Sequence, residues 1–476
     1  MNADQREAVR ENAKYLRNVR PLDPDEISEY VTGQPHPAAV RQVLRESAVE
    51  LGLVERADGR FEPVADGPLD VAFDGVAAFP DSCGRVLDER LVERYGPDWP
   101  AGESGARIRE RVRTVKAAYL RGDPVEYDAE TALCYALYHL PDYYAAVQYV
   151  LAELVDARLL DRDLRVLDVG AGVGGPALGL ADFLPENALV GYHAVEPSEA
   201  ADVLDRLLSE TGRNVRATVH RTTAEAFDPR RDVEWFDADE RFDLVVFANV
   251  LSELDDPAGV VEAYADALAE DGTVVGLAPA DRNTALGLRA VERTVADEGP
   301  LTVYAPTVRL WPGYAPTDEC WSFDARPDLA VPAFQERLAE AADGDPEEFV
   351  NVDVQYAYSL LRRDGRRRYD VDLDASQVAR FADADTHVTE RVDCYAAKLS
   401  HDLSDGGNPL YRVADGSQRT AHFAVLTRET ALNDVLGQAD YGDLLRFENV
   451  LVLWNDDERA YNLVVDDETI VDPIPG

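Results

Sequence analysis

The stretch that decides the predicted fold reads Val166-Leu167-Asp168-Val169-Gly170-Ala171-Gly172-Val173-Gly174-Gly175. Its apolar first half is typical of a buried strand, and the glycines that follow let the backbone turn tightly and approach a ligand. A helix expected from residue 175 would present unpaired backbone N–H groups to that ligand. Strand, turn and helix together predict a cofactor site at residues 168–174.

The glycines alone fit two kinds of cofactor, because Gly170, Gly172 and Gly175 also satisfy the GxGxxG pattern of dinucleotide-binding folds. Asp168 separates the two: a carboxylate at the strand tip would repel a pyrophosphate, whereas it suits the ammonium and sulfonium groups of S-adenosylmethionine (SAM). We therefore predict SAM as the cofactor. The residues expected to contact it here are Asp168, Gly170, Ala171, Gly172 and Gly174.

Glu196 follows the second predicted strand, in Ala194-Val195-Glu196-Pro197. A carboxylate at that position can accept hydrogen bonds from two ribose hydroxyls. The competing interpretation is an exposed loop acid in a chain rich in acids. Its place after a strand and before a helix-breaking proline favours the cofactor contact.

The fourth predicted strand leads into Asn249, Ser252 and Glu253, at the sheet edge where ligands bind in open α/β folds. We predict these three as the catalytic residues, with Asn249 also touching the cofactor. The Asn/Asp-Pro-Pro-Tyr/Phe tetrapeptide that holds an exocyclic amine does not follow this strand, and neither does a cysteine that could attack a pyrimidine ring. The methyl acceptor therefore stays open.

Strands alternate with helices from residue 164 onward, which predicts a mainly parallel sheet covered on both faces. Strands are expected at 164–169, 189–195, 215–220, 242–247 and 273–277. A helix at about 331–342, flanked by strands at 320–323 and 352–361, would add the closing antiparallel pair. We therefore predict an α/β fold, a class I (Rossmann-like) SAM methyltransferase domain, at residues 161–365.

The N-terminal residues 1–64 are predicted to be winged-helix-like. One helix opens at Asp23-Pro24, a second runs from Pro37 to about residue 52, and residues 60–64 form a hairpin-like wing. Such modules bind nucleic acid, but docking or dimerisation is an equally good interpretation. The second helix has Arg41 and Arg45 together with Glu46 and Glu50.

Residues 65–160 are predicted to form a helical domain, with an amphipathic, tyrosine-rich segment at 129–160. Its rings belong either to the core or, less typically, to a base-stacking surface. The C-terminal residues 386–476 show five strand-like runs with a short helix near 429–436 between the third and fourth, the layout of an OB-like β-barrel. A structural barrel and a nucleic-acid-binding one both remain open, with Phe423, Tyr441, Phe447 and Trp454 as stacking candidates.

Charge is the most unusual global feature, since 92 acidic and 47 basic residues give a formal net charge of −45. The only lysines are Lys14, Lys116 and Lys398, so nearly all positive charge lies on arginine. Molar salt shortens the Debye length to roughly 3 Å and makes such repulsion tolerable. The composition predicts a halophilic protein, in which an acidic surface does not exclude nucleic acid as a partner.

Four cysteines, Cys83, Cys134, Cys320 and Cys394, lie far apart without a CxxC pair. We predict reduced thiols and no metal site. The sequence contains neither an apolar run of membrane-spanning length nor a signal peptide, which predicts a cytoplasmic protein without a membrane partner. It does not indicate an oligomeric state.

The sequence resembles the ribosomal small-subunit methyltransferase-like proteins of mitochondria, bacteria and archaea. The likeness covers about residues 129–365, and its most specific piece is Val250-Leu251-Ser252-Glu253-Leu254. The other pieces are Tyr138-His139-Leu140-Pro141-Asp142-Tyr143-Tyr144-Ala145-Ala146-Val147, Leu167–Gly172, Phe242–Asn249 and Gln355–Arg363. Many members have four cysteines for an iron–sulfur cluster before the last strand, whereas this chain keeps only Cys320 there.

The resemblance implies a SAM-dependent methyltransferase, or a methyltransferase-like assembly factor, whose partner is the small ribosomal subunit or its RNA. Two alternatives remain: a small-molecule SAM-dependent methyltransferase, for which the terminal modules would be surplus, and a non-catalytic ribosome-associated protein that binds SAM as a structural ligand. The absence of a recognisable acceptor motif leaves both open.

Overall fold

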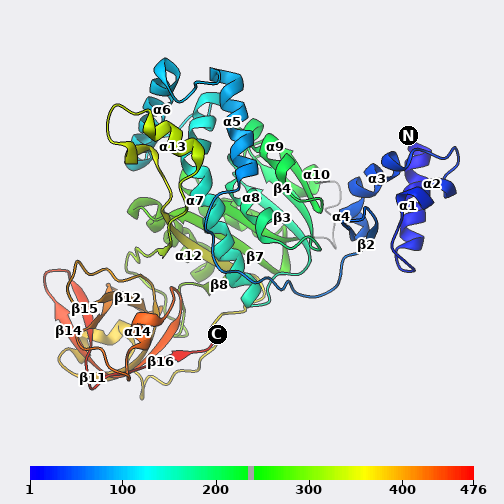
Figure 1. Cartoon of the computed structure of the whole chain (residues 1–476). Coiled ribbons are helices and arrows are strands. Elements are labelled where there is room, and N and C mark those ends of the chain that lie inside the picture. The colour runs from blue at the N-terminus through cyan, green and yellow to red at the C-terminus, as the bar shows by residue number, and fades with distance from the viewer. Residues whose placement is uncertain (234–240) are drawn as a thin grey trace. The chain divides into compact units, whose positions relative to one another are not determined.

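Figure 1 shows the computed structural model of the chain, which describes residues 1–233 and 241–476. The chain divides into two units, Met1–Val246 with Pro327–Val354, and Phe247–Arg326 with Gln355–Gly476. The predicted methyltransferase domain is thus shared between them, with its glycine turn in the first unit and its fifth strand in the second. Within the described residues, every helix is too short or too polar to cross a lipid bilayer.

The first unit contains the parallel half of the predicted sheet, and its four strands follow the order β5-β4-β3-β6. They are β3 (Asp163–Val169), β4 (Leu189–Val195), β5 (Val215–His220) and β6 (Phe242–Ala248), which confirms the four predicted strands to within a residue. The helices α8 (Gly175–Phe183) and α9 (Ala200–Leu207) follow β3 and β4. Strands β3 and β4 are buried over nearly their whole length because helices cover them, as an all-parallel sheet requires.

The predicted helical domain consists of α5 (Asp81–Tyr95), α6 (Gly102–Arg121) and α7 (Ala129–Asp156). Helix α7 packs closely on α8: a Cβ on Gly175 would lie 2.8 Å from Tyr143 Cβ, and one on Gly179 would lie 2.3 Å from Val147 Cγ1. Only glycine allows this approach. Since Gly175 and Gly179 meet Tyr143 and Val147 in the same order, the two helices run parallel.

The N-terminal module contains α1 (Ala3–Leu16), α2 (Pro24–Tyr30), α3 (Pro37–Glu46), α4 (Ala48–Leu51) and a hairpin of β1 (Leu53–Glu55) and β2 (Phe61–Pro63). The helices expected after Asp23 and from Pro37 are present, but the second ends at Glu46 and a separate short helix follows. Helix α1 was not predicted. The winged-helix assignment remains a prediction.

In the second unit the strands follow the order β7-β10-β8, with β7 (Leu268–Pro279), β10 (Val354–Arg362) and β8 (Thr302–Ala305) all antiparallel. The strand predicted at 320–323 begins directly after those residues, as β9 (Asp324–Arg326), and it pairs with β10 as expected. Cys320 itself has a φ of +49°, which is not extended. The strand at the end of this order, β8, was not predicted and has only four residues. Helices α11 (Pro257–Ala265) and α12 (Arg282–Asp297) follow β6 and β7, in keeping with the predicted alternation of strands and helices.

The C-terminal residues form a closed barrel of five strands in the order β11-β12-β13-β15-β14, with β14 pairing back to β11. Its strands are β11 (Arg391–Lys398), β12 (Leu410–Ala414), β13 (His422–Leu426), β14 (Leu444–Asn455) and β15 (Ala460–Val465). The predicted barrel is therefore confirmed, and α14 (Val435–Gln438) lies between its third and fourth strands, where Leu436 packs into the barrel core. An additional strand, β16 (Ile470–Ile474), was not predicted and pairs with β14.

Candidate functional site

The glycine turn joins β3 to α8 through three residues with left-handed backbone: φ is +74° at Gly170, +53° at Gly172 and +96° at Gly174. The backbone N–H groups of Gly170 and Ala171 both donate to the Val195 carbonyl, at 2.9 and 3.1 Å. The turn is thereby fastened to the end of β4. Gly174 is the N-cap of α8 and has no capping side chain, so the first N–H groups of that helix are left for a ligand.

Glu196, which follows β4, also holds the glycine turn in place through hydrogen bonds. Its Oε2 accepts from the Gly172 N–H and its Oε1 accepts from the Ser198 N–H, both at 2.9 Å. The residue is 7% exposed, so it is not the free loop acid of the competing interpretation. A carboxylate oxygen has two lone pairs, and each oxygen therefore keeps one for a ribose hydroxyl.

Asp168 is completely buried below the turn. Its Oδ2 accepts from the Tyr192 hydroxyl at 2.6 Å, while its Oδ1 has no hydrogen-bond partner among the described residues. Burial raises the pKa of the Asp168 carboxyl to about 7, opposed by the Tyr192 hydrogen bond and reinforced by the charge of Glu196. The aspartate thus lacks the positive partner that its charged form requires.

These residues fit a cationic cofactor on two counts. The unpartnered Asp168 Oδ1 is an acceptor without a donor, which the ammonium of SAM supplies. A Cβ added to Gly172 would meet no atom closer than the Gly170 carbonyl oxygen at 4.0 Å, so the turn faces open space there. Asp168, the glycine turn and Glu196 would hold SAM.

Tyr192 was missed by the sequence analysis. It lies within β4 and is almost fully buried, and no local pattern distinguishes it from a core tyrosine. The pairing of β3 and β4 alone places its hydroxyl against Asp168.

The predicted catalytic residues Asn249, Ser252 and Glu253 follow β6 at the start of the second unit. Asn249 has a φ of +59°, and its N–H donates to the Leu277 carbonyl at 2.9 Å. A left-handed asparagine ends the strand sharply, because asparagine tolerates this conformation better than most residues. Ser252 and Glu253 are exposed within a short 3₁₀ turn. Their catalytic role stays a prediction.

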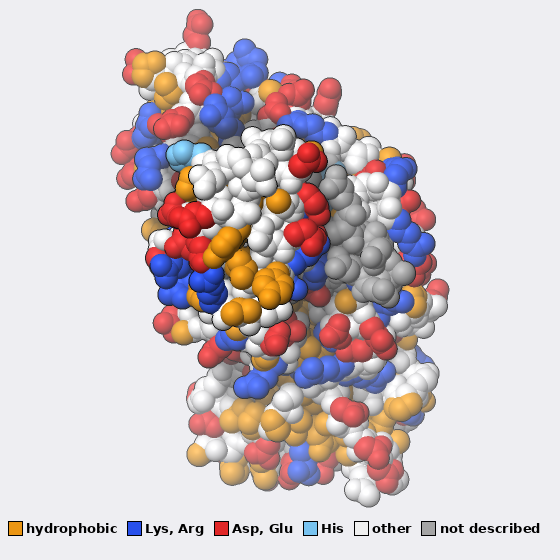
Figure 2. Space-filling model, turned by 90° about the vertical axis from the view of Figure 1, so that its right-hand side faces the viewer, with side chains coloured by type: hydrophobic (Ala, Val, Ile, Leu, Met, Phe, Trp, Pro, Cys, Tyr) orange, Lys and Arg blue, Asp and Glu red, His pale blue; other side chains and the backbone are white. Residues whose placement is uncertain are grey.

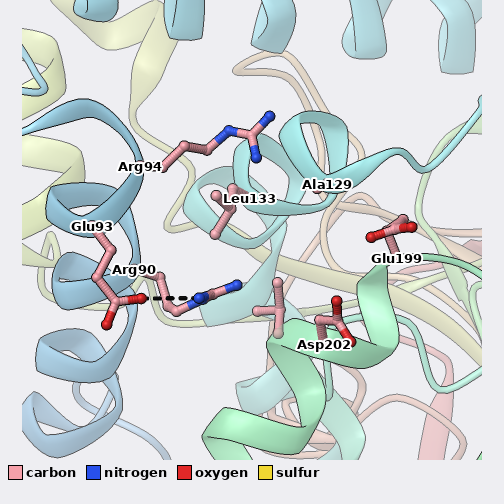
Figure 3. Close-up of a pocket in the computed structure, with 8 residues that line it drawn as sticks. Arg90, Glu93, Arg94, Ala129, Leu133, Glu199 and Asp202 are labelled. Carbon is pink, nitrogen blue, oxygen red and sulfur yellow. Dashed lines mark hydrogen bonds and ion pairs between the residues drawn. The ribbon is translucent and has the colours of Figure 1, made fainter.

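A pocket of about 210 Å³ lies in the first unit between α5, the first turns of α7 and the start of α9. Figure 3 shows its lining, with Arg90 and Arg94 from α5 and Glu199 and Asp202 from the segment that follows Glu196. Arg90 pairs with Glu93 at 2.9 Å. Charges of both signs line this pocket, which argues against a simple anion site.

The arginines of α3 are engaged within the protein. Arg45 forms two hydrogen bonds to Glu55, at 2.5 and 2.8 Å, and its carbonyl accepts from Arg216 Nε at 2.8 Å. Asn214 also donates to and accepts from the backbone of Glu55. Helix α3 and strand β1 therefore pack on the residues at the start of β5, which supports the docking interpretation of this module.

The four aromatic residues predicted as stacking candidates in the barrel differ in solvent exposure. Phe447 and Tyr441 are buried, and Phe423 is half-buried with the Arg412 guanidinium 5.9 Å from its ring centre. Trp454 is 39% exposed and contacts Tyr461 edge-on at 4.8 Å between ring centres. Only Trp454 of the four can offer a large ring surface to a base.

Lys and Arg side chains are interspersed with Asp and Glu side chains across the face shown in Figure 2. Among residues 1–233 and 241–476, no three His, Cys, Asp or Glu side chains are arranged to hold a metal ion, and all four cysteines are free and buried.

The geometry of the turn and its carboxylates defines a SAM-dependent methyltransferase fold, and SAM is the cofactor of that fold. Accordingly, residues 143–330 match the family model described as a methyltransferase domain. Residues 6–57 and 382–474 match the N-terminal and C-terminal domains of one family of unknown function, DUF8157. No curated protein matches the chain.

The chain is similar to several solved methyltransferases. One is a SAM-dependent methyltransferase from Clostridium acetobutylicum, at 13% identity over 36% of this chain and 57% of that one, with a TM-score of 0.22. Another is the mitomycin 7-O-methyltransferase, at 14% identity over 76% and 93% of the two chains, with a TM-score of 0.29. A third, from Pyrococcus horikoshii and provisionally named an RNA methyltransferase, has 14% identity over 46% and 82%, with a TM-score of 0.28. Superpositions this loose say nothing about the substrate.

Proposed function

We propose that this chain is a SAM-dependent methyltransferase, or a methyltransferase-like assembly factor, that acts on the RNA of the small ribosomal subunit in a halophilic cell. The observation that carries the cofactor part is the buried Asp168 oxygen without a partner below a turn held by Glu196. SAM supplies both the missing cation and the ribose hydroxyls for these two carboxylates.

The RNA part is supported by the likeness of residues 129–365 to the ribosomal small-subunit methyltransferase-like proteins. The exposed Trp454 on a closed five-stranded barrel adds a surface on which an unpaired base can stack. Stacking persists in molar salt, whereas phosphate contacts weaken there because binding then gains little from counterion release. A halophilic RNA-binding protein should therefore use aromatic contacts more than charge.

The decisive experiment is transfer of a labelled methyl group from SAM to isolated small subunits in molar potassium chloride. We expect label in the small-subunit RNA with the wild-type protein and far less with Asp168→Asn, whose neutral amide loses the charge pair with the cofactor's ammonium. SAM binding without label would favour a non-catalytic assembly factor. Label in small metabolites but not in RNA would favour the small-molecule alternative.

A further inference from the structure

His139 on α7 lies within a ring of tyrosines. The imidazole is stacked on Tyr143 with an interplanar angle of 10° and ring centres 5.4 Å apart, and Tyr135 and Tyr138 each lie 4.9 Å away. Tyr119, on α6, completes the enclosure at 6.1 Å. The side chain is still 19% exposed, so the ring is held in place but is not sealed from solvent.

Asp142 and Asn351 both face Nδ1 of this imidazole. Asp142 Oδ2 lies 3.8 Å and Asn351 Nδ2 lies 3.5 Å from it. The Asn351 amide already donates to the Tyr138 carbonyl and to Asp142 Oδ2, both at 3.0 Å, and an amide nitrogen has only two hydrogens to give. Nδ1 therefore finds an acceptor in Asp142 and no remaining donor in Asn351.

The proton of the neutral imidazole consequently belongs on Nδ1, directed toward Asp142, and Nε2 keeps its lone pair. Among the described residues, no hydrogen-bond partner is found for Nε2. A histidine whose one nitrogen faces a carboxylate while the other is a bare acceptor has the arrangement of a general base. The contact of 3.8 Å is long for a hydrogen bond, as catalytic contacts often are before a substrate is bound.

The position of His139 relative to the cofactor residues follows from the packing of α7 on α8. The two helices run parallel, and Tyr143 lies against Gly175, the first residue of α8. His139 precedes Tyr143 by one helical turn, about 6 Å along the axis. It therefore lies beyond the start of α8, on the side of the glycine turn and of the strand ends where cofactors bind.

We propose that His139 accepts the proton released in the methyl transfer, with Asp142 as the residue that orients it. The inference rests on the proposed function as a methyltransferase, and it names the acceptor's chemical class: a nucleophile with a dissociable O–H or N–H proton. When bound, SAM supplies an electrophilic methyl carbon, to which the acceptor atom bonds as the carbon–sulfur bond breaks to leave S-adenosylhomocysteine. The acceptor's proton passes to His139 Nε2, and the resulting imidazolium is stabilised by the Asp142 carboxylate until solvent removes the proton.

Nitrogen NMR of histidine-labelled protein tests the geometry without any methyl acceptor. We expect His139, assigned through its loss in His139→Gln, to have its proton on Nδ1, and Asp142→Asn to disturb this form because an amide can donate to Nδ1. We also expect the Nε2 signal to shift more with SAM than with S-adenosylhomocysteine, which lacks the sulfonium charge, while His36 on the N-terminal module serves as the unaffected control. A proton on Nε2, or equal responses to the two ligands at saturation, would overturn the proposal.

Single-turnover transfer to small subunits provides the second test. We expect His139→Gln to slow transfer about 100-fold or more while SAM affinity stays unchanged, and added imidazole to restore part of the rate of His139→Ala. His36→Gln should transfer at the wild-type rate. Full activity of His139→Gln would refute the role of His139, whereas a wild-type protein that neither binds SAM nor transfers methyl would refute the proposed function itself.

Discussion

Glu196 Oε2 accepts a hydrogen bond from the Gly172 backbone N–H at 2.9 Å, so the acid after β4 holds the glycine turn after β3. The same carboxylate braces the segment that leads into α9 through the Ser198 N–H. One side chain thereby positions both walls of the predicted cofactor site. A residue expected only to contact ribose also shapes the site.

Replacing Glu196 should therefore affect both affinity and local order. We expect Glu196→Ala to weaken SAM binding by roughly 1–3 kcal/mol, because charge-assisted hydrogen bonds are lost. Calorimetry in molar salt measures this. Glu199→Ala is a matched control, since Glu199 lines the neighbouring pocket but does not contact the turn in any hydrogen bond found here. Equal affinities for wild type and Glu196→Ala would remove Glu196 from the site.

The raised pKa of Asp168 predicts a pH-dependent stability. Its carboxyl titrates at about 7 in the fold and at 3.8 when unperturbed, so the folded state retains a proton that the unfolded chain releases between these values. The contribution of Asp168 to the free energy of unfolding is therefore complete below pH 3.8 and is lost as the pH rises through about 7. Melting temperatures of wild type and Asp168→Asn should therefore diverge as the pH rises from about 4 to about 7, with the wild type losing more.

SAM should counteract this loss, since a bound ammonium favours the ionised carboxylate. We expect SAM to bind wild-type protein more tightly above about pH 7 than at about pH 5, with proton release detected by calorimetry in buffers of different ionisation enthalpy. Asp168→Asn should lose that proton release. An affinity independent of pH in the wild type would contradict the pairing of Asp168 with the ammonium.

Salt should stabilise the protein. A formal net charge of −45 produces repulsion that extends over about 10 Å at 0.1 M salt and only roughly 3 Å at 1 M. Surface ion pairs such as Arg221 with Asp202 respond in the opposite direction, but each contributes only about 0–1 kcal/mol. We expect the melting temperature to rise more with potassium chloride than with a neutral osmolyte of equal osmolarity, because only the salt screens the repulsion. A melting temperature that falls with salt would mean that ion pairs outweigh repulsion.

Trp454→Ala tests the barrel as an RNA surface. Loss of one stacking contact should weaken association with small subunits by about 1–3 kcal/mol in molar potassium chloride and leave SAM affinity intact. Trp321→Ala is the matched control, because Trp321 is exposed to a similar degree, 42% against 39%, but lies outside the barrel strands. Co-sedimentation that is unchanged by Trp454→Ala would make the barrel structural.

Deleting residues 386–476 should lower the stability of the rest of the second unit. Within the second unit, Trp311 Nε1 donates to Asp415 Oδ2 at 2.7 Å, and Tyr441 shares a hydrogen bond of 2.7 Å with Ser322. Removing the barrel would break both hydrogen bonds, each of which contributes about 0.5–1.5 kcal/mol to stability. We expect the truncated protein to melt at a lower temperature even where its cofactor affinity is retained.

The alternation of apolar strands and amphipathic helices is local, which explains why four parallel strands, the glycine turn and five barrel strands could be predicted from the residues alone. The strand predictions that failed also have local causes. The strand predicted at 320–323 begins only at Asp324, because Cys320 takes a left-handed conformation that no neighbouring residue signals. Strand β8 has only four residues, too few for a clear alternation.

The sequence by itself determined which residues could bind a cofactor, since a strand, a glycine turn and an acid after the next strand follow one another along the chain. Only the tertiary structure decided how they act. The pairing of β3 with β4 buries Asp168 against Tyr192, and the packing of α7 on α8 sets Tyr143, one helical turn after His139, against the first residue of α8. These relationships join residues far apart in the chain, and their energies come from burial and hydrogen bonds that exist only once the strands and helices have packed.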